Sequence, residues 1–252
     1  MLSLNELLPI AVLAFFVEII DSSLGMGYGT ILSPLLLILG FNPLVSIPAI
    51  LLSQSVGGLI AGLSHHQLKN SDFRFGGRDS KIFLAFSFFG ILAAVLGAIL
   101  AVHISSKVIQ TYIGLLVSAV GVFLALKIKF SFSRSKIIAL ALLSGFNKAV
   151  SGGGFGPLTT GGQVVLGHNH KNSIGITTLS QFPICLASFI AYAAVNGFPQ
   201  SYLPLVMSIG AAAAAPLGAS LTKKIDTRGV DLALAVLVII LGTGLLIKTW
   251  FL

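Results

Sequence analysis

Charge is the property that this sequence lacks most. Only 22 of its 252 residues are charged, 15 Lys or Arg and 7 Asp or Glu, whereas a soluble domain of this length has roughly 63. Hydrophobic residues make up 56% of the chain and its mean hydropathy is +1.02, enough for about six to eight membrane crossings of about 20 residues each. This excludes a water-soluble catalytic domain and predicts a single all-α integral membrane domain over residues 1–252.

Cysteine and cleavage signals are scarce as well. Cys185 is the one cysteine, so no intrachain disulfide can form. Residues 1–9 contain no basic segment and no A-x-A site, so we expect the first apolar run to be retained. The net charge of +8 comes from short loops between apolar runs, which fits positive-inside topology better than nucleic-acid binding. We therefore expect a multi-pass protein of the inner or plasma membrane with no nucleic-acid partner.

The apolar runs fall into two length classes. Six runs of 18 to 23 residues can cross a core of about 30 Å, and they occupy residues 44–64, 82–102, 108–126, 173–195, 202–221 and 230–247. Four runs of 10 to 14 residues occupy residues 7–20, 30–39, 137–146 and 157–167. Glycine-rich breaks at 21–29 and 148–156 divide the short runs into two hairpins of half-helices, whose second arms we expect to begin at Thr30 and Pro157.

A shift of 127 positions aligns the two hairpin regions. Eleven of the 34 positions from 21 to 54 are then identical, including three glycines of each break and a Leu-Ser-Gln segment at 52–54 and 179–181. Weaker matches continue through the later helices at a shift of 121. The chain is therefore a tandem duplication, with repeats over about 1–127 and 128–252 that each hold one hairpin and three crossings.

Loop charge favours re-entrant hairpins, because each half then crosses three times, the second half is inverted, and both termini lie outside. This arrangement puts twelve basic residues inside and two outside. The inside set is Lys69, Arg74, Arg78, Lys81, Lys127, Lys129, Arg134, Lys136, Lys171, Lys223, Lys224 and Arg228, and the outside set is Lys107 and Lys248. In the alternative, eight crossings with parallel halves, the split is nine to five.

Inverted repeats with interrupted helices are typical of secondary transporters, whose substrate site lies where the interruptions meet. Each second half-helix would point its free amides and positive dipole end toward the membrane centre, and glycine lets backbone approach a small oxyanion closely. We therefore predict an anion site formed by Gly25, Gly27, Gly29, Thr30, Ser53, Gln54, Lys148, Gly152, Gly154, Gly156, Ser180 and Gln181.

Three ionisable residues lie nearest the expected midplane, where charge is usually functional or paired. They are Glu18, Asp21 and Lys148, and the last two occupy equivalent positions in the repeats. One interpretation is a structural ion pair between Asp21 and Lys148. The other is substrate binding by Lys148 with ion coupling by Asp21 and Glu18. The Ser-Gln segments likewise either bind the anion or hold helices together.

Neither a metal nor a cofactor is expected. His65-His66 and His168-x-His170 lie in expected loops without a cysteine or carboxylate cluster nearby. The G-x-G-x-G segment at 25–29 is not the dinucleotide fingerprint, and no strand precedes it.

The doubled layout resembles the TauE/SafE family of membrane exporters over nearly the whole chain. The resemblance rests on a G-x-G-x-G break after a short apolar run, a half-helix, a short Gly-x-Asn loop and a long helix with an internal polar pair, all present twice. It implies a transporter rather than an enzyme, with sulfite, a sulfonate or a related small sulfur oxyanion as substrate.

Two other function classes stay open. Undecaprenyl-pyrophosphate phosphatases resemble this layout, but such an enzyme needs a midplane arginine and a Ser/Glu cluster, and neither hairpin contains arginine. A passive anion channel shares every feature above, and only flux measurements separate it from a transporter. The sequence does not decide the anion, H⁺ or Na⁺ coupling, the direction of flux, or whether the protein is a homodimer.

Overall fold

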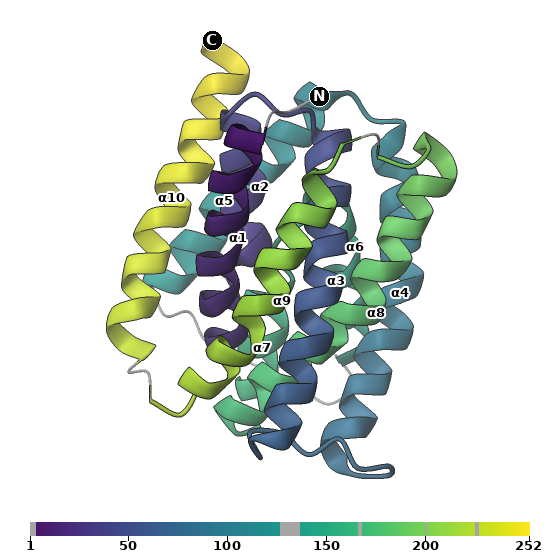
Figure 1. Cartoon of the computed structure of the whole chain (residues 1–252), viewed down its shortest axis with the longest axis vertical. Helices are drawn as coiled ribbons and strands as arrows, with labels where there is room; N and C mark the ends of the chain where they lie inside the picture. The colour runs from purple at the N-terminus through teal and green to yellow at the C-terminus, as the bar shows by residue number, and fades with distance from the viewer. Residues whose placement is uncertain (1–3, 127–136, 166–167, 200, 225–226) are drawn as a thin grey trace.

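The computed structural model describes residues 4–126, 137–165, 168–199, 201–224 and 227–252, and these ranges form ten α-helices and no strand (Figure 1). In chain order the helices are α1 (Leu4–Leu24), α2 (Tyr28–Ile38), α3 (Pro43–Gln67), α4 (Arg78–Val102), α5 (Ser106–Ala125), α6 (Ile137–Ser151), α7 (Phe155–Val165), α8 (His170–Asn196), α9 (Leu203–Leu221) and α10 (Thr227–Phe251). The prediction of an all-α fold is confirmed.

Among the described residues, seven helices are long and apolar enough to cross a membrane. Six of them, α3, α4, α5, α8, α9 and α10, are the crossings predicted from the apolar runs. The seventh is α1, which has 21 residues where we predicted a half-helix over residues 7–20. Length and hydropathy therefore do not distinguish α1 from a crossing, although the next helix follows after only three residues.

The breaks are shorter than predicted, because their polar residues do not end the preceding helix. α1 continues through Asp21 to Leu24, and α6 continues through Lys148 to Ser151. The hydroxyl groups of Ser22 and Ser23 bind groups one turn back in α1 and so stay within the helix. Only the segments 25–27 and 152–154 lie outside helices, and both contain the glycines.

The second helix of each hairpin begins earlier than predicted. α2 starts at Tyr28 and α7 at Phe155, rather than at Thr30 and Pro157. Pro157 is thus the third residue of its helix instead of the first. The position still accepts proline, because the first four amides of a helix have no intrahelical acceptor.

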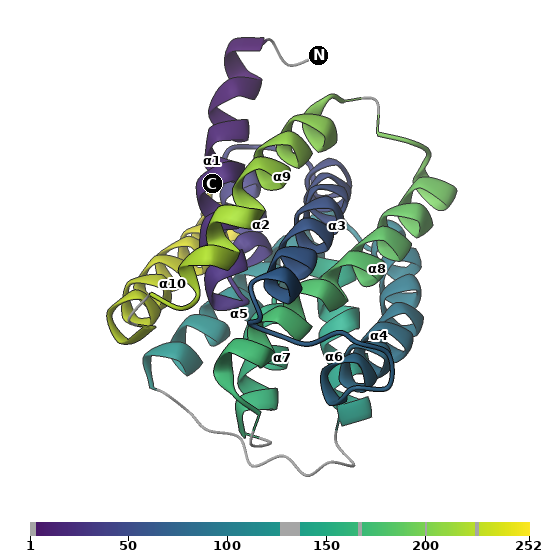
Figure 2. The ribbon, with the colours of Figure 1, turned by 60° about the horizontal axis from the view of Figure 1, so that its bottom comes forward.

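Six helices form a row in which each packs on the next, in the order α1, α9, α3, α8, α4, α6, and Figure 2 shows this row as an arc. In the two repeats, α1 is equivalent to α6, α3 to α8, and α4 to α9. Exchanging each helix of the row for its equivalent gives the same row in reverse order. The remaining long helices, α5 and α10, are equivalents of each other and form a pair. Helices at equivalent positions therefore make equivalent contacts.

Two pairs of equivalent helices, α3 with α8 and α5 with α10, run in opposite directions. Ser71, just after α3, donates a hydrogen bond to the carbonyl oxygen of Asn172 in the first turn of α8, so α3 and α8 are antiparallel. Trp250 near the end of α10 donates to Thr111 in the first turns of α5. Figure 1 shows α2 in the upper half and α7 in the lower half, with both termini at the upper end.

The orientation of the halves across a bilayer stays a prediction, as does the division into repeats at 127/128. The repeat boundary and the basic residues Lys127, Lys129, Arg134 and Lys136 lie outside the described residues.

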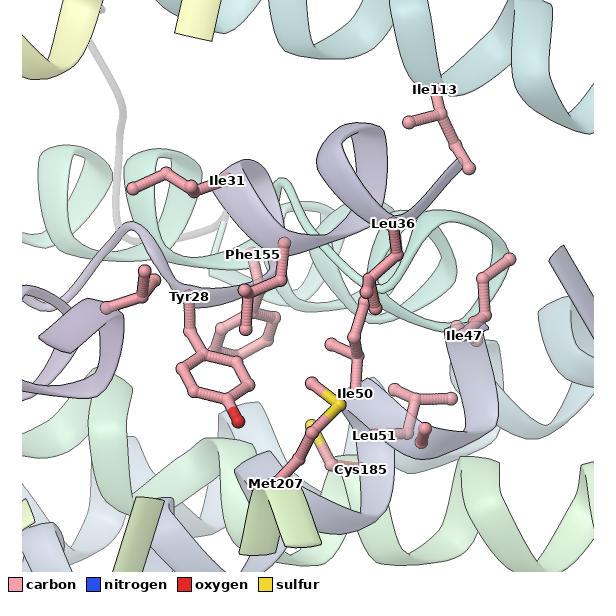
Figure 3. Close-up of a cluster of buried hydrophobic side chains, with 14 of the residues drawn as sticks. Tyr28, Ile31, Leu36, Ile47, Ile50, Leu51, Ile113, Phe155, Cys185 and Met207 are labelled. Atoms are coloured by element: carbon pink, nitrogen blue, oxygen red, sulfur yellow. The ribbon is translucent and has the colours of Figure 1, made fainter. Parts of the chain in front are cut away.

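Small residues let the helices in the row approach closely. A Cβ atom at Gly210 of α9 would collide with the backbone of α1 at Ala11, and one at Gly145 of α6 would collide with Gly90 of α4. The larger of two buried hydrophobic clusters includes Tyr28 and Phe155 from the starts of α2 and α7 (Figure 3). The large side chains at the hairpin tips thus anchor both tips in the same core.

Candidate functional site

The two hairpin turns have the same local geometry. The amide of Gly25 donates to the carbonyl oxygen of Asp21 at 2.7 Å, and the amide of Gly152 donates to that of Lys148 at 2.8 Å. Both glycines have left-handed φ angles, +74° and +70°, a conformation that side chains with a Cβ rarely adopt. The residues that end α1 and α6 are therefore equivalent in structure as well as in sequence.

The tips of the two hairpins touch each other through backbone. A Cβ atom at Gly29 would collide with the carbonyl group of Gly152, and one at Gly156 would collide with that of Gly25. A shift of 127 positions converts Gly29 into Gly156 and Gly25 into Gly152, so each hairpin makes the same contact with the other. Glycine at positions 29 and 156 is therefore required by the other hairpin, and these atoms face protein rather than open space.

A cluster of four buried polar side chains lies beside the tips, and we call it the Asp21–Lys148 cluster. Its members are Asp21, Gln54, Lys148 and Gln181, each at most 2% exposed. The Lys148 ammonium donates to Gln54 Oε1, to Gln181 Oε1 at 3.2 Å, and to the carbonyl oxygen of Gly152 at 3.0 Å. Asp21 Oδ2 accepts from Gln54 Nε2 at 3.0 Å and from Gln181 Nε2 at 3.2 Å.

Each glutamine therefore bridges the carboxylate and the ammonium, with its amide oxygen toward Lys148 and its amide nitrogen toward Asp21. No direct contact between Asp21 and Lys148 is among the ion pairs of the described residues. The predicted proximity of these two charges is present in the structure, but neutral amides separate them. The ammonium is thus surrounded by dipoles instead of by a counter-ion.

The acidic residue and the basic residue of the cluster differ in their contact with the first amide of the neighbouring helix. Asp21 Oδ1 accepts a hydrogen bond from the amide of Tyr28 at 3.0 Å, so this carboxylate occupies the positive end of α2. The equivalent position beside α7 holds Lys148, which cannot accept a hydrogen bond. Positive charge is therefore concentrated at the second hairpin, where the ammonium and the N-terminus of α7 lie together.

The two predicted serines do not join the cluster. Ser53 donates to the carbonyl oxygen of Ile50 in its own helix and accepts from the hydroxyl of Tyr28 at 2.9 Å. Ser180 donates to the carbonyl oxygen of Ile176 at 2.7 Å. Of each predicted Ser-Gln pair, only the glutamine reaches Asp21 and Lys148.

The remaining predicted residues shape the turns. Gly27 precedes α2 with a φ of +135°, and Gly154 precedes α7 with a φ of +74°. Thr30 is buried in the first turn of α2, with its amide nitrogen close to Gly153 of the other tip. These three residues build the tips, and the charged contacts come from the cluster.

Glu18 lies one turn before Asp21 on α1 and is fully buried. Its Oε1 accepts from the hydroxyl of Ser22 at 2.6 Å, while its Oε2 has no hydrogen-bond partner. Gly57 of α3 faces the carboxyl group, and a Cβ atom there would lie 2.9 to 3.0 Å from its carbon and oxygens. The sequence prediction of a buried acidic residue near the cluster thus agrees with the described structure.

Several polar residues near the site were missed from the sequence. Thr160 of α7 donates to the carbonyl oxygen of Gly25 at 3.3 Å, and Gln163 donates to Thr177 of α8 at 3.0 Å. Tyr192 of α8 donates to the carbonyl oxygen of Ala149, next to Lys148, at 3.0 Å. The sequence signal that could have identified Thr177 is its polarity within an apolar run, because it lies on α8 one turn before the predicted site residue Gln181.

A cavity of about 460 Å³ lies at the end of the molecule where α1, α3 and α9 begin and α8 ends. Its lining includes Leu7, Pro48, Tyr192, Asn196 and Tyr202. Because the hydroxyl of Tyr192 binds Ala149, this side chain separates the cavity from the backbone beside Lys148. None of the four cluster residues lines the cavity.

The opposite end is closed by a buried polar network. His65 Nε2 lies 2.9 Å from the carbonyl oxygen of Ser22, and Asn70 lies 3.0 Å from both His65 Nδ1 and the carbonyl oxygen of Ala219. These contacts join the ends of α1, α3 and α9. They also correct the sequence interpretation of His65, which is a buried residue of α3 and not part of a solvated loop.

The comparisons with known proteins agree with this architecture. The profile of the family described as sulfite exporter TauE/SafE matches residues 10–245. A curated relative, the "Probable membrane transporter protein YtnM" of Bacillus subtilis (strain 168), is 26% identical over 263 aligned positions that cover 98% of this chain and 85% of the relative. No solved structure matches the chain. The helices, the doubled hairpins and the family profile together show that this chain is a multi-pass membrane transporter protein that belongs to the TauE/SafE family.

Proposed function

We propose that this protein is a secondary transporter that exports a small sulfur-containing anion, such as sulfite or an organosulfonate, by alternating access to Lys148. The observation that carries the proposal is the environment of the ammonium group. It is buried beside the hairpin tips, and its three hydrogen-bond acceptors are two amide oxygens and one backbone carbonyl.

A buried ammonium held by neutral oxygens can exchange them for an anion. An oxyanion supplies the acceptor atoms that Gln54 and Gln181 now provide, and it adds the opposite charge, which makes hydrogen bonds roughly twice as strong. The N-terminus of α7 adds a favourable dipole at the same place. At the first hairpin the carboxylate of Asp21 already occupies the equivalent helix end, so we assign the anion to the second hairpin.

The two ends of the molecule support alternating access. A cavity lies at one end, with Tyr192 between it and the backbone beside Lys148, while the His65–Asn70 network fills the other end. Under the positive-inside assignment, the open end is the outside. Export would then require the network to open toward the cytoplasm while the region around Tyr192 closes.

The substrate class is supported by the comparisons rather than by geometry. The family description names sulfite export, and the Bacillus relative is described as a membrane transporter. The cluster itself favours any small anion that can approach an ammonium between two amides.

The test is counterflow and net uptake in proteoliposomes with sulfite, alkylsulfonates, sulfate and carboxylates. We expect saturable transport of at least one sulfur oxyanion, and a roughly 10- to 100-fold weaker apparent affinity in Lys148→Gln, because a hydrogen bond to a charged group contributes about 1.5–3 kcal/mol. Lys171→Gln, which removes an exposed lysine of α8, is the matched control and should leave affinity unchanged.

Three results would contradict the proposal. Flux that neither saturates nor shows counterflow would indicate a channel. A folded Lys148→Gln protein with unchanged affinity would remove Lys148 from the site. Absence of transport for the whole panel by folded protein would remove the substrate class.

A further inference from the structure

Glu18 is an unusual group to find sealed in a membrane protein. It is fully buried, its Oε2 has no hydrogen-bond partner, and Gly57 places the backbone of α3 directly against the carboxyl group. Lipid and protein interior stabilise a carboxylate poorly unless its oxygens are hydrogen-bonded and its charge is paired. Asp21, one turn away, accepts hydrogen bonds on both oxygens, whereas Glu18 accepts one on Oε1 and none on Oε2.

The charges around the cluster do not balance when both carboxyl groups are ionised. The ionisable groups that interact with Glu18 include Asp21 on its own helix and Lys148 from α6. Two carboxylates and one ammonium leave one negative charge in excess. A proton on Glu18 restores neutrality, and Asp21, with three donors on its oxygens, is the carboxyl group better suited to stay ionised.

The other helices around α1 do not supply a second positive charge. From α2, the ionisable side chain is that of Tyr28, whose hydroxyl donates to Ser53. α9 contains no Asp, Glu, Lys, Arg, His, Cys or Tyr between residues 203 and 221. The nearby thiol of α8 is Cys185. From α3, His65 contacts the backbone of Ser22, and its Nδ1 faces the amide nitrogen of Asn70, which matches a neutral ring.

Resting on the proposed anion site at Lys148, we propose that Glu18 is the binding site for a proton that moves together with the anion. With Glu18 ionised, the empty cluster has one negative charge in excess, and an anion bound at Lys148 would raise that excess to two. The loaded site therefore favours a protonated Glu18 more strongly than the empty site does. On the side where the site opens, water donates a proton to the carboxylate, and on the other side the carboxylic acid returns it to water.

Linkage makes this coupling reciprocal. A proton on Glu18 strengthens anion binding, and a bound anion strengthens proton binding by the same factor. Anion affinity should therefore rise as the pH falls, by at most about tenfold per pH unit for one linked proton. Anion binding should also remove protons from a weakly buffered solution.

The experiment uses purified full-length protein and methanesulfonate, whose charge is constant over the range studied. Affinity is measured by calorimetry between about pH 5 and 8, and proton uptake is measured with a pH indicator. We expect pH-dependent affinity and proton uptake in the wild type, and neither in Glu18→Gln, which mimics the neutral acid. Asp72→Asn removes a carboxylate whose side chain is 60% exposed and should behave as the wild type.

Transport gives a second readout. Glu18→Gln in proteoliposomes should retain anion counterflow but lose anion accumulation driven by a pH gradient. A wild-type protein that binds methanesulfonate with pH-independent affinity and without proton uptake would overturn the proton site while leaving the anion site intact. The same holds if Glu18→Gln keeps the wild-type pH dependence. If Glu18→Gln does not fold, proton uptake by the wild type still shows whether anion binding is coupled to proton binding. If the wild type binds neither methanesulfonate nor any anion of the transport panel, the anion site fails, and with it the proposed function.

Discussion

The hairpin formed by α1 and α2 and the hairpin formed by α6 and α7 end their first helices with the same hydrogen bond, but carry opposite charges at the position that accepts it. Asp21 and Lys148 are equivalent in sequence and in backbone geometry. Gln54 and Gln181, also equivalent, contact both of them. The backbone and the amides thus keep the symmetry that the charges break.

The two equivalent hairpins therefore differ in the charge beside the start of their second helix. The first hairpin neutralises its own helix start, because the Asp21 carboxylate binds the amide of Tyr28. The second hairpin has the Lys148 ammonium at the equivalent position, so no carboxylate of the hairpin offsets the positive end of α7. Four changes test this contrast, and they are ordered by the size of their expected effect.

The first tests the opposite orientation of the hairpins. Asn42 and Asn169 are exposed, equivalent residues that cap α3 and α8 by accepting from Leu44 and Lys171 amides at 2.8 and 2.9 Å. With Cys185 replaced by alanine, a cysteine at 42 should react with an impermeant thiol reagent in intact cells, and one at 169 should be protected until the cells are opened. Reaction of both in intact cells would mean that the halves are parallel.

The second change removes the charges. Asp21→Asn or Lys148→Gln leaves the other charge with amide and backbone partners only, which should lower the free energy of unfolding by up to about 3–5 kcal/mol. The double variant should recover most of this stability in thermal unfolding of purified protein, yet bind no anion. Losses that simply add in the double variant would show that the two charges do not interact.

The third change tests the backbone contact between the tips. Gly156→Ala forces a Cβ atom into Gly25 and Met26 of the other hairpin, and overpacking of this kind costs about 1–3 kcal/mol. Gly161→Ala, in the same helix, meets nothing within 4 Å and serves as the control. Equal thermal stability of the two variants would contradict the contact.

The smallest effect concerns a hydroxyl that only one hairpin has. Tyr28 binds Ser53, whereas the equivalent Phe155 has no hydroxyl. Tyr28→Phe should reduce the free energy of unfolding by about 1 kcal/mol without changing anion affinity. Tyr202→Phe, at an exposed side chain, controls for the substitution. A large loss of affinity in Tyr28→Phe would place this hydroxyl in the anion site.

Six of the seven long helices were predictable, because apolar length is a property of the sequence, whereas α1 was predicted as a half-helix. The extent of each break was not predictable. The sequence predicts Asp21 and Lys148 to lie in the breaks, because polar residues and glycine occur there together, yet α1 and α6 continue past them to the residue before a glycine. The helices end where a glycine with a positive φ angle follows, at Gly25 and Gly152, and not at the polar residues.

The composition of the cluster was only partly predictable. Successive residues of a helix point about 100° apart, so Ser53 and Gln54 could not both face the same group, and sequence alone did not say which would. That the glutamines separate Asp21 from Lys148 depends on side-chain rotamers. Tyr192 and Thr160 were missed because their partners are backbone carbonyl groups of the hairpin tips, which no side-chain pattern reveals.

The contact between the tips also sets an order of events during biosynthesis. Thr160 reaches the carbonyl oxygen of Gly25 across 135 positions, and Ser33 reaches that of Ser151 across 118. The ribosome must therefore add nearly half of the chain, from the end of α2 at Ile38 to Thr160, before the first hairpin can make these contacts. Until then its glycine backbone lacks the surface that covers it in the finished protein. Docking of the hairpins is consequently a late, long-range folding step, and a nascent chain that stops before α7 cannot complete it.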